Sequence, residues 1–124
     1  MKARFVNEYV VLQPKSKEDI IMDLKKLTQK ELDTLLIRTT ANGIKELVEM
    51  CLNAGADINT KIRWGRTPLM VASLNGYKDI VKMFVDIGVN VNAKSKDGQT
   101  ALIIASQNGY TDIVKLLKKY GAKE

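Results

Sequence analysis

The glycines of this 124-residue chain recur with a period of 33 residues. All eight fall on three lines, which are Gly43, Gly76 and Gly109; Gly55, Gly88 and Gly121; and Gly65 and Gly98. The same step relates further positions, namely Thr34, Thr67 and Thr100; Leu36, Leu69 and Leu102; Asn42, Asn75 and Asn108; and Val48, Val81 and Val114. A fixed period of about 20 to 50 residues indicates one supersecondary unit stacked on copies of itself.

The central copy of the unit shows what each repeat should contain. Thr67 can cap a helix start with its hydroxyl, and Pro68 suits the first helical position because its missing N–H costs nothing there. Gly76 can supply the left-handed conformation that ends this short helix. A second helix should follow, with an apolar face made of Ile80, Val81, Met83, Phe84 and Ile87. Asp97-Gly98 then predicts a tight turn, so a projecting loop should complete the unit.

These features resemble the ankyrin repeat, which has a 33-residue period and the helix-start motif T-P-L-H-x-A. The motif stands here as Thr67-Pro68-Leu69-Met70-Val71-Ala72 and, more loosely, as Thr100-Ala101-Leu102-Ile103-Ile104-Ala105. The family's G-A-D-V-N phrase stands as Gly55-Ala56-Asp57-Ile58-Asn59 and as Gly88-Val89-Asn90-Val91-Asn92. The motif's histidine is replaced by Met70 and Ile103, and the first copy at Thr34 has also lost the proline.

The resemblance implies an all-α solenoid of helix-turn-helix units with projecting β-hairpin-like loops. We expect about seven helices and no extended sheet. The domains expected are an N-terminal capping segment at 1–33 and three repeats at 34–66, 67–99 and 100–124. Terminal units of a solenoid need atypical outer faces, which is why the segment before the repeats is interpreted as a cap.

The capping segment combines an apolar arm with an extra helix. Capping boxes at Ser16–Asp19 and Thr28–Glu31 predict two helix starts, the first of them for a helix at about Lys17 to Lys26. The arm carries the apolar residues Phe5, Val6, Tyr9, Val10, Val11 and Leu12. Apolar surface on this scale is rarely left in water. We favour an arm that lies along the first helices over a detachable docking or assembly segment.

Catalysis is not expected from this sequence. The chain has no histidine, so the commonest general base is absent. Cys51 aligns with Phe84 and Leu117, which are interior positions of the second helix, and is interpreted as a small buried hydrophobe. Gly-rich phosphate loops, paired-cysteine zinc spacings and EF-hand loops are missing. The sequence therefore predicts no enzyme, no cofactor and no metal site.

Composition indicates the compartment and the type of partner. A single cysteine fits a reducing compartment, and the chain has neither a secretory segment nor an apolar run of about 18 residues. We expect a cytoplasmic monomer that does not enter the membrane and is not secreted. The formal charge is +6, from 20 Lys and Arg against 14 Asp and Glu. This excess favours an acidic partner.

The resemblance implies a protein-binding module whose concave face, made of loop tips and first helices, meets the partner. The family's contact positions flank the loop glycine and end the first helix. Carried onto this sequence they are Lys61, Arg63, Trp64 and Arg66; Lys94, Lys96, Asp97 and Gln99; Leu74 and Asn75; and Gln107 and Asn108. Asn59, Asn92 and the loop glycines are interpreted as framework. The alternatives are binding of nucleic acid or another polyanion through the basic loops, and an assembly role of the arm.

Trp64 is the strongest single candidate among these positions. Its counterpart one repeat later is Asp97, and a position that accepts both residues is not part of the core. We therefore expect the only tryptophan of the chain to lie largely in water. It is interpreted as an anchor for a partner. The alternative is that the indole folds back onto the long side chains of its own loop.

Overall fold

The computed structural model describes residues 15–124, so the predicted arm at Met1 to Leu12 lies outside the described residues. Its α-helices are α2 (Lys17–Leu24), α3 (Gln29–Ala41), α4 (Lys45–Asn53), α5 (Pro68–Asn75), α6 (Lys78–Asp86), α7 (Ala101–Gln107) and α8 (Thr111–Lys119). A short 3₁₀ turn, η1 (Arg63–Gly65), lies in the first loop. From residue 15 to the C-terminus no strand is assigned. The prediction of an all-helical fold with about seven helices is confirmed, since residues 15–124 form seven α-helices.

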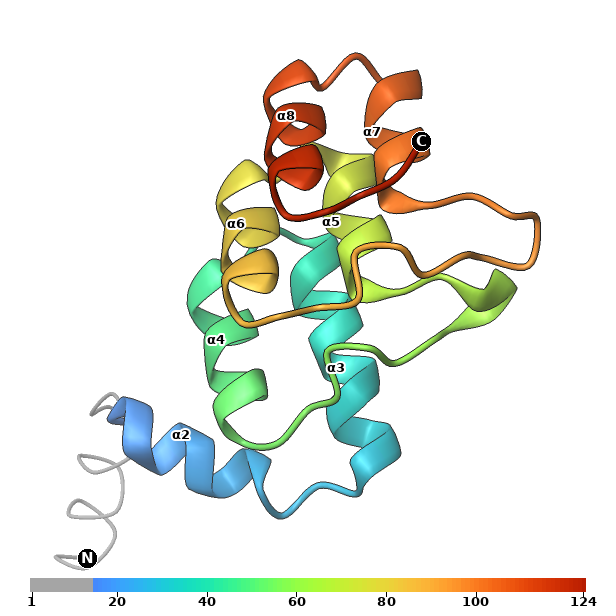
Figure 1. The fold of residues 1–124 in the computed structure, drawn as a ribbon. Coiled ribbons are helices and arrows are strands. Elements are labelled where there is room, and N and C mark those ends of the chain that lie inside the picture. Colours follow the sequence, from blue (N-terminus) through green and yellow to red (C-terminus); the bar gives the residue numbers. More distant parts are fainter. Residues whose placement is uncertain (1–14) are drawn as a thin grey trace, which may run out of the picture.

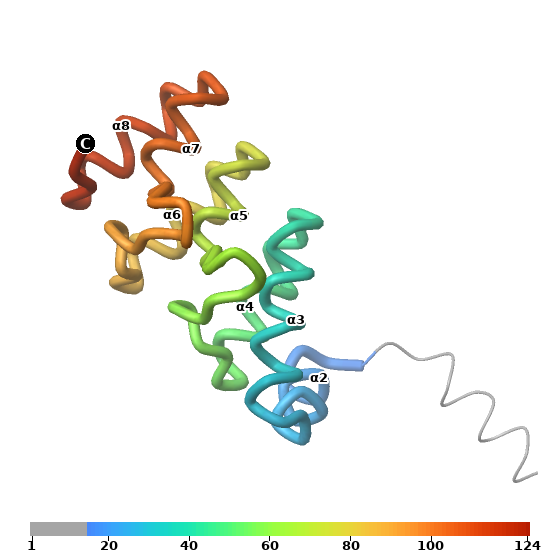
Figure 2. Tube along the Cα trace, turned by 90° about the vertical axis from the view of Figure 1, so that its right-hand side faces the viewer, coloured from blue at the N-terminus to red at the C-terminus, as the bar shows by residue number. Residues whose placement is uncertain are grey.

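The helices stack in two rows (Figure 1). The first helices of the repeats, α3, α5 and α7, pack side by side in one row, and the second helices α4, α6 and α8 pack in the other. Figure 2 shows the first helices following one another along the stack. The loops 54–67 and 87–100 project from the same side of this stack. The extra helix α2 packs against α4, at the start of the second row.

Helix starts follow the capping residues read from the sequence. The Thr67 hydroxyl accepts the Met70 N–H at 3.3 Å, and Pro68 occupies the first turn of α5. Helix α3 begins earlier in its repeat, because Thr28 forms a complete capping box there. Thr34 therefore lies inside α3, and its hydroxyl donates to the Lys30 carbonyl at 2.8 Å. Without the proline that fixes the start of α5, nothing prevents the first copy from extending toward its N-terminus.

The core is shared between neighbouring repeats, as the period predicts. Cys51, Phe84 and Leu117 are all fully buried, which confirms the interpretation of the cysteine as a packing residue. The predicted apolar face of α6 is correct for Ile80, Val81 and Phe84 but wrong for Ile87, which is 55% exposed. Helix α6 ends at Asp86, so Ile87 is its C-cap and leaves the buried face.

Tyrosines of one repeat pack on glycines of the repeat before. A Cβ atom built on Gly76 would lie 2.8 Å from the ring of Tyr110, and one on Gly43 would lie 2.9 Å from the ring of Tyr77. Both glycines also have positive φ, of 72° and 74° for Gly43 and Gly76. These positions therefore require glycine for two reasons, the left-handed backbone and the space that the ring takes.

Asparagine side chains connect successive loops. The Asn59 Oδ1 accepts the Asn90 N–H at 3.1 Å, and one repeat later the Asn92 Oδ1 accepts the Lys123 N–H at 2.9 Å. In the first repeat the acceptor comes from helix α3 instead, where Asp33 Oδ1 accepts an N–H from the loop at 2.8 Å. Asn59 and Asn92 therefore hold the backbone of the next unit, in agreement with their interpretation as framework residues.

Candidate binding surface

Each of the two projecting loops closes as a hairpin-like turn. In the first loop the Ile62 N–H donates to the Arg66 carbonyl at 2.9 Å, and in the second the Ser95 N–H donates to the Gln99 carbonyl at 2.9 Å. The loop glycine has positive φ in both turns. The two loops thus have equivalent backbone hydrogen bonds, and they differ in their side chains.

The loops also lie against each other. The Lys96 N–H donates to the Trp64 carbonyl at 2.8 Å, and the Lys61 Nζ donates to the Lys94 carbonyl at 3.3 Å. Residues that are one repeat apart in the sequence therefore become neighbours in space. This contact gathers three predicted lysines and the predicted tryptophan at the loop tips.

The side chains of the two turns have opposite character. In the second loop the Ser95 hydroxyl donates to the Asp97 carboxylate and accepts the Gln99 N–H at 3.1 Å. The bond from Ser95 lowers the pKa of Asp97 below its usual value. In the first loop Ile62 and Trp64 take the positions of Ser95 and Asp97, and both are exposed. The first turn therefore replaces a polar network with apolar surface.

Trp64 combines exposure with an unusual backbone. Its side chain is 64% exposed, which agrees with the expectation that it lies largely in water. Its φ of 68° makes it the one non-glycine residue with positive φ in the range 15–124. An L-residue in the left-handed region costs roughly 1–2 kcal/mol. The loop thus keeps a bulky aromatic residue where glycine would be less strained.

A groove of about 850 Å³ lies between the first part of α3 and the first loop. It is lined by Gln29, Lys30, Asp33, Thr34, Ile37, Arg38, Thr60, Lys61, Ile62 and Arg63. Four of these side chains are basic, while the only carboxylate, that of Asp33, accepts backbone and side-chain bonds from its own neighbourhood. We call this the concave groove. Its walls are basic and its apolar contacts come from Ile37 and Ile62.

A smaller crevice of about 50 Å³ lies between α5 and α7. It contains five of the predicted contact residues, which are Arg66, Leu74, Gln99, Gln107 and Asn108. The remaining helix-end prediction, Asn75, donates from its side chain to the Val71 carbonyl at 2.9 Å, and Asn108 makes the equivalent bond to Ile104 at 2.8 Å. These two asparagines therefore also close their own helices.

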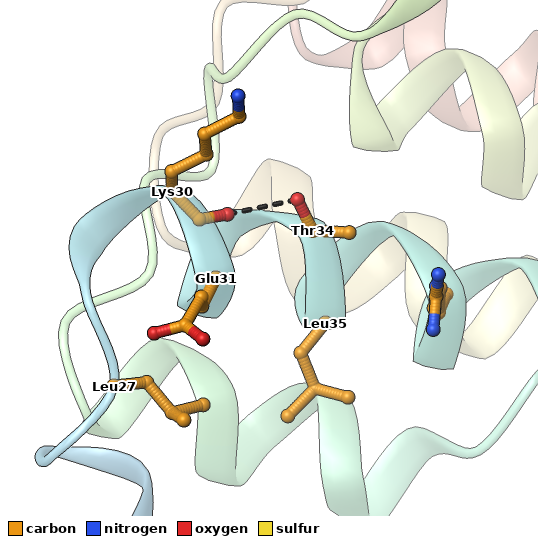
Figure 3. Close-up of a pocket in the computed structure, with 6 residues that line it drawn as sticks. Leu27, Lys30, Glu31, Thr34 and Leu35 are labelled. Atoms are coloured by element: carbon orange, nitrogen blue, oxygen red, sulfur yellow. Dashed lines mark hydrogen bonds between the residues drawn. The ribbon is translucent and has the colours of Figure 1, made fainter.

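A third groove, of about 340 Å³, opens on the other flank of α3. It is lined by Leu27, Lys30, Glu31, Thr34, Leu35 and Arg38 (Figure 3). Figure 3 shows Leu27 and Leu35 pointing to the same side of the helix, with Glu31 between them. We call this the end groove. Lys30, Thr34 and Arg38 line it together with the concave groove, so they form the ridge between the two.

A family model described as ankyrin repeats, in three copies, matches residues 24–124. The chain belongs to the ankyrin-repeat family. No curated protein matches it. Ankyrin repeats are generally protein–protein interaction modules and are typically non-catalytic. The match starts at residue 24, inside the predicted capping segment, and the boundary at 33 stays a prediction.

The ankyrin-repeat surface presents most of the predicted contact residues to solvent. Ten of the twelve are exposed, and the other two, Arg66 and Gln99, are half-buried in the small crevice. Four further residues line the concave groove but were not predicted from the sequence, namely Lys30, Thr34 and Arg38 of α3 and Ile62 of the first loop. A spacing of four residues places the three α3 residues on one helix face, and this signal was available in the sequence.

None of the helices between residues 15 and 124 combines the length and hydrophobicity needed to cross a bilayer. Over the same range no three His, Cys, Asp or Glu side chains lie close enough together to bind a metal ion. Burial raises the pKa of the Cys51 thiol, as its place in the core requires.

Proposed function

We propose that this ankyrin-repeat protein binds an acidic segment of a partner protein in the concave groove, with Trp64 as the anchor at its edge. The observation that carries the proposal is the groove of about 850 Å³ with four basic side chains, directly followed in the chain by a 64% exposed tryptophan. Trp and Arg are over-represented among residues that dominate binding energy at interfaces. Basic walls speed the approach of an acidic segment and select against basic ones.

The partner segment should also carry apolar side chains. Ile62 is exposed at the groove wall and Ile37 is buried at its floor, so acidic groups alone would leave this apolar surface uncovered. The loop-tip lysines Lys94 and Lys96 and the crevice between α5 and α7 extend the same surface along the stack. A partner longer than the groove would contact Leu74 and Gln107 next.

A second candidate is the binding of nucleic acid or another polyanion. It is favoured by the contact between the loops, which brings Lys61, Lys94 and Lys96 together. Affinity for nucleic acid falls steeply with salt because bound counterions are released. An interface anchored by an aromatic side chain is much less sensitive. Salt dependence therefore distinguishes the two candidates.

Selection from a random peptide library displayed on phage tests the first candidate without knowledge of the natural partner. We expect the selected peptides to be rich in Asp and Glu and to carry apolar residues. Trp64→Ala should weaken binding of a selected peptide by about 2 kcal/mol, or roughly 30-fold in Kd. Ile87→Ala removes another exposed apolar side chain, 55% exposed at the end of α6, and should leave the affinity unchanged.

Charge reversal provides the second measurement. Arg38→Glu should slow association with the same peptide, whereas Lys115→Glu changes the net charge equally on α8 and should have little effect. If selected peptides bind Trp64→Ala and Arg38→Glu as tightly as the unchanged protein, the concave groove is not the binding site. Tight binding of a single-stranded oligonucleotide that is lost in salt and in Lys94→Glu/Lys96→Glu would support the second candidate instead.

A further inference from the structure

Among the described residues, the row of first helices begins with α3. Helix α5 packs on α3 and α7 packs on α5, so each of these first helices is covered by the one before it. In the second row α4 is likewise preceded by α2. Within residues 15–124, however, no helix stands before α3 in the first row (Figure 1). The end groove lies on this flank of α3.

The repeat register shows what the end groove corresponds to. Leu35 is equivalent to Pro68 and Ala101, which are fully buried, but Leu35 itself is only half-buried. Arg38 is equivalent to Ile104, which is buried in the crevice between α7 and the preceding first helix α5. The end groove is therefore the surface that the later repeats cover with the first helix of the preceding unit.

We propose that the apolar arm Phe5–Leu12 of the same chain occupies the end groove. In each repeat the first helix comes directly before the second helix in the sequence. Helix α2 packs before α4 and so takes the position of a second helix. The segment directly before α2 is therefore expected to take the position of a first helix, beside α3. Six of the eight residues of Phe5–Leu12 are apolar, which suits a segment that packs on the Leu27 and Leu35 side chains in the end groove.

The connection and the charges are compatible with this placement. Helix α2 has eight residues and is therefore about 12 Å long. The residues from Phe5 to Pro14 can span up to about 33 Å, so they can run back along α2 to the groove. Lys15, at the start of the described chain, already reaches along α2 to the Asp23 carboxylate at 2.5 Å. Glu8 is the only acidic residue among the first 14 and would meet the basic ridge of Lys30 and Arg38.

Occupation of the end groove would affect the concave groove as well. Lys30, Thr34 and Arg38 line both grooves. An arm packed in the end groove would therefore contact these three residues and restrict the motion of their side chains. Helix α2 contains no fully buried residue, which shows that it alone does not close this end of the core. The proposal about the arm is independent of the partner that binds in the concave groove.

Paramagnetic relaxation in the 124-residue chain tests the proposal. A nitroxide label is attached to Arg38→Cys, and the native Cys51 is fully buried and so should not react. The amide signals of Phe5–Leu12 should lose most of their intensity in dilute protein. A label at Lys115→Cys, on α8 at the opposite end of the stack, is the matched control and should leave those signals intact.

Two further samples make the result decisive. In an equal mixture of labelled protein and unlabelled ¹⁵N-protein, the arm signals of the unlabelled copy should be unaffected, and their loss would assign the groove to a second copy. In Leu35→Glu carrying the same label, the arm signals should recover while circular dichroism shows the repeats still folded. Full arm intensity in the dilute Arg38→Cys sample would overturn the proposal, whatever the variant shows.

Discussion

Replacement of Trp64 by glycine should give a more stable protein than replacement by alanine. Both variants remove the same indole, which is 64% exposed, so both lose the same packing. They differ only in the Cβ atom at a residue whose φ is 68°. The comparison therefore isolates the backbone strain at this position from the loss of the side chain.

The expected magnitude follows from two opposing effects. A Cβ in the left-handed region costs roughly 1–2 kcal/mol, which favours glycine. The greater freedom of glycine in the unfolded chain favours alanine by about 0.4–1 kcal/mol. Trp64→Gly should therefore exceed Trp64→Ala in free energy of unfolding by about 1 kcal/mol, or roughly 4 °C in Tm.

The second loop provides the matched control. Asp97 is the equivalent residue and does not have positive φ. At this position alanine should be more stable than glycine by about 0.4–1 kcal/mol, because only the unfolded-state effect remains. The preference should thus change sign between the two loops. Urea unfolding followed by far-UV circular dichroism measures all four variants, since Trp64 is the only tryptophan and its fluorescence is lost.

Backbone strain at Trp64 is refuted if alanine and glycine rank in the same order of stability at positions 64 and 97. If Trp64→Ala were more stable than Trp64→Gly by about 0.4–1 kcal/mol, as expected at position 97, the loop would have relaxed out of the left-handed region once the indole is removed. In either case the two variants should weaken peptide binding equally, because both lack the anchor that the concave groove is proposed to use.

Three further substitutions test separate features of the repeats. Thr40→Val should raise the free energy of unfolding by about 1 kcal/mol, because its buried hydroxyl has no hydrogen-bond partner among residues 15–124, whereas Thr39→Val removes a hydroxyl that donates to carbonyls and should not. In thermal melts, Gly76→Ala should be more destabilising than Gly109→Ala by about 1–3 kcal/mol, since only the first clashes with a tyrosine ring although both have positive φ. The Thr28 N–H donates to the Glu31 carboxylate and lowers the pKa of Glu31. The stabilisation of the folded state by this carboxylate is therefore present above its usual pKa of 4.5 and is lost as the pH falls through the lowered pKa. Acid unfolding of Glu31→Gln should depend less on pH in this range.

The period made most of the fold predictable. Repeated positions such as Leu36, Cys51 and Gly76 each have two counterparts that report the same environment, so their burial or backbone conformation could be predicted. The capping box at Thr28 also made the early start of α3 predictable. Ile87 was assigned to the apolar face because helical spacing does not tell where a helix ends.

The candidate site was predictable only in part. Comparison of Trp64 with Asp97 predicted exposure, but its left-handed backbone could not be expected, because a bulky residue rarely adopts it. The volume of the concave groove depends on the distance between the first loop and α3. This distance could not be predicted from the sequence. The end groove depends on α2 packing against α4, which leaves Leu35 half-covered, and neither capping nor periodicity determines this choice.

The asparagine bonds between loops have a consequence for how such a chain can grow. Asn59 holds the backbone of the second unit and Asn92 holds that of the third, through the same atoms and the same sequence separation. A duplicated copy of residues 67–99 would therefore arrive with both the acceptor and the donor that its two new junctions need. Gene duplication can lengthen this protein by whole repeats, because each repeat contains one half of every bond that joins it to its neighbours.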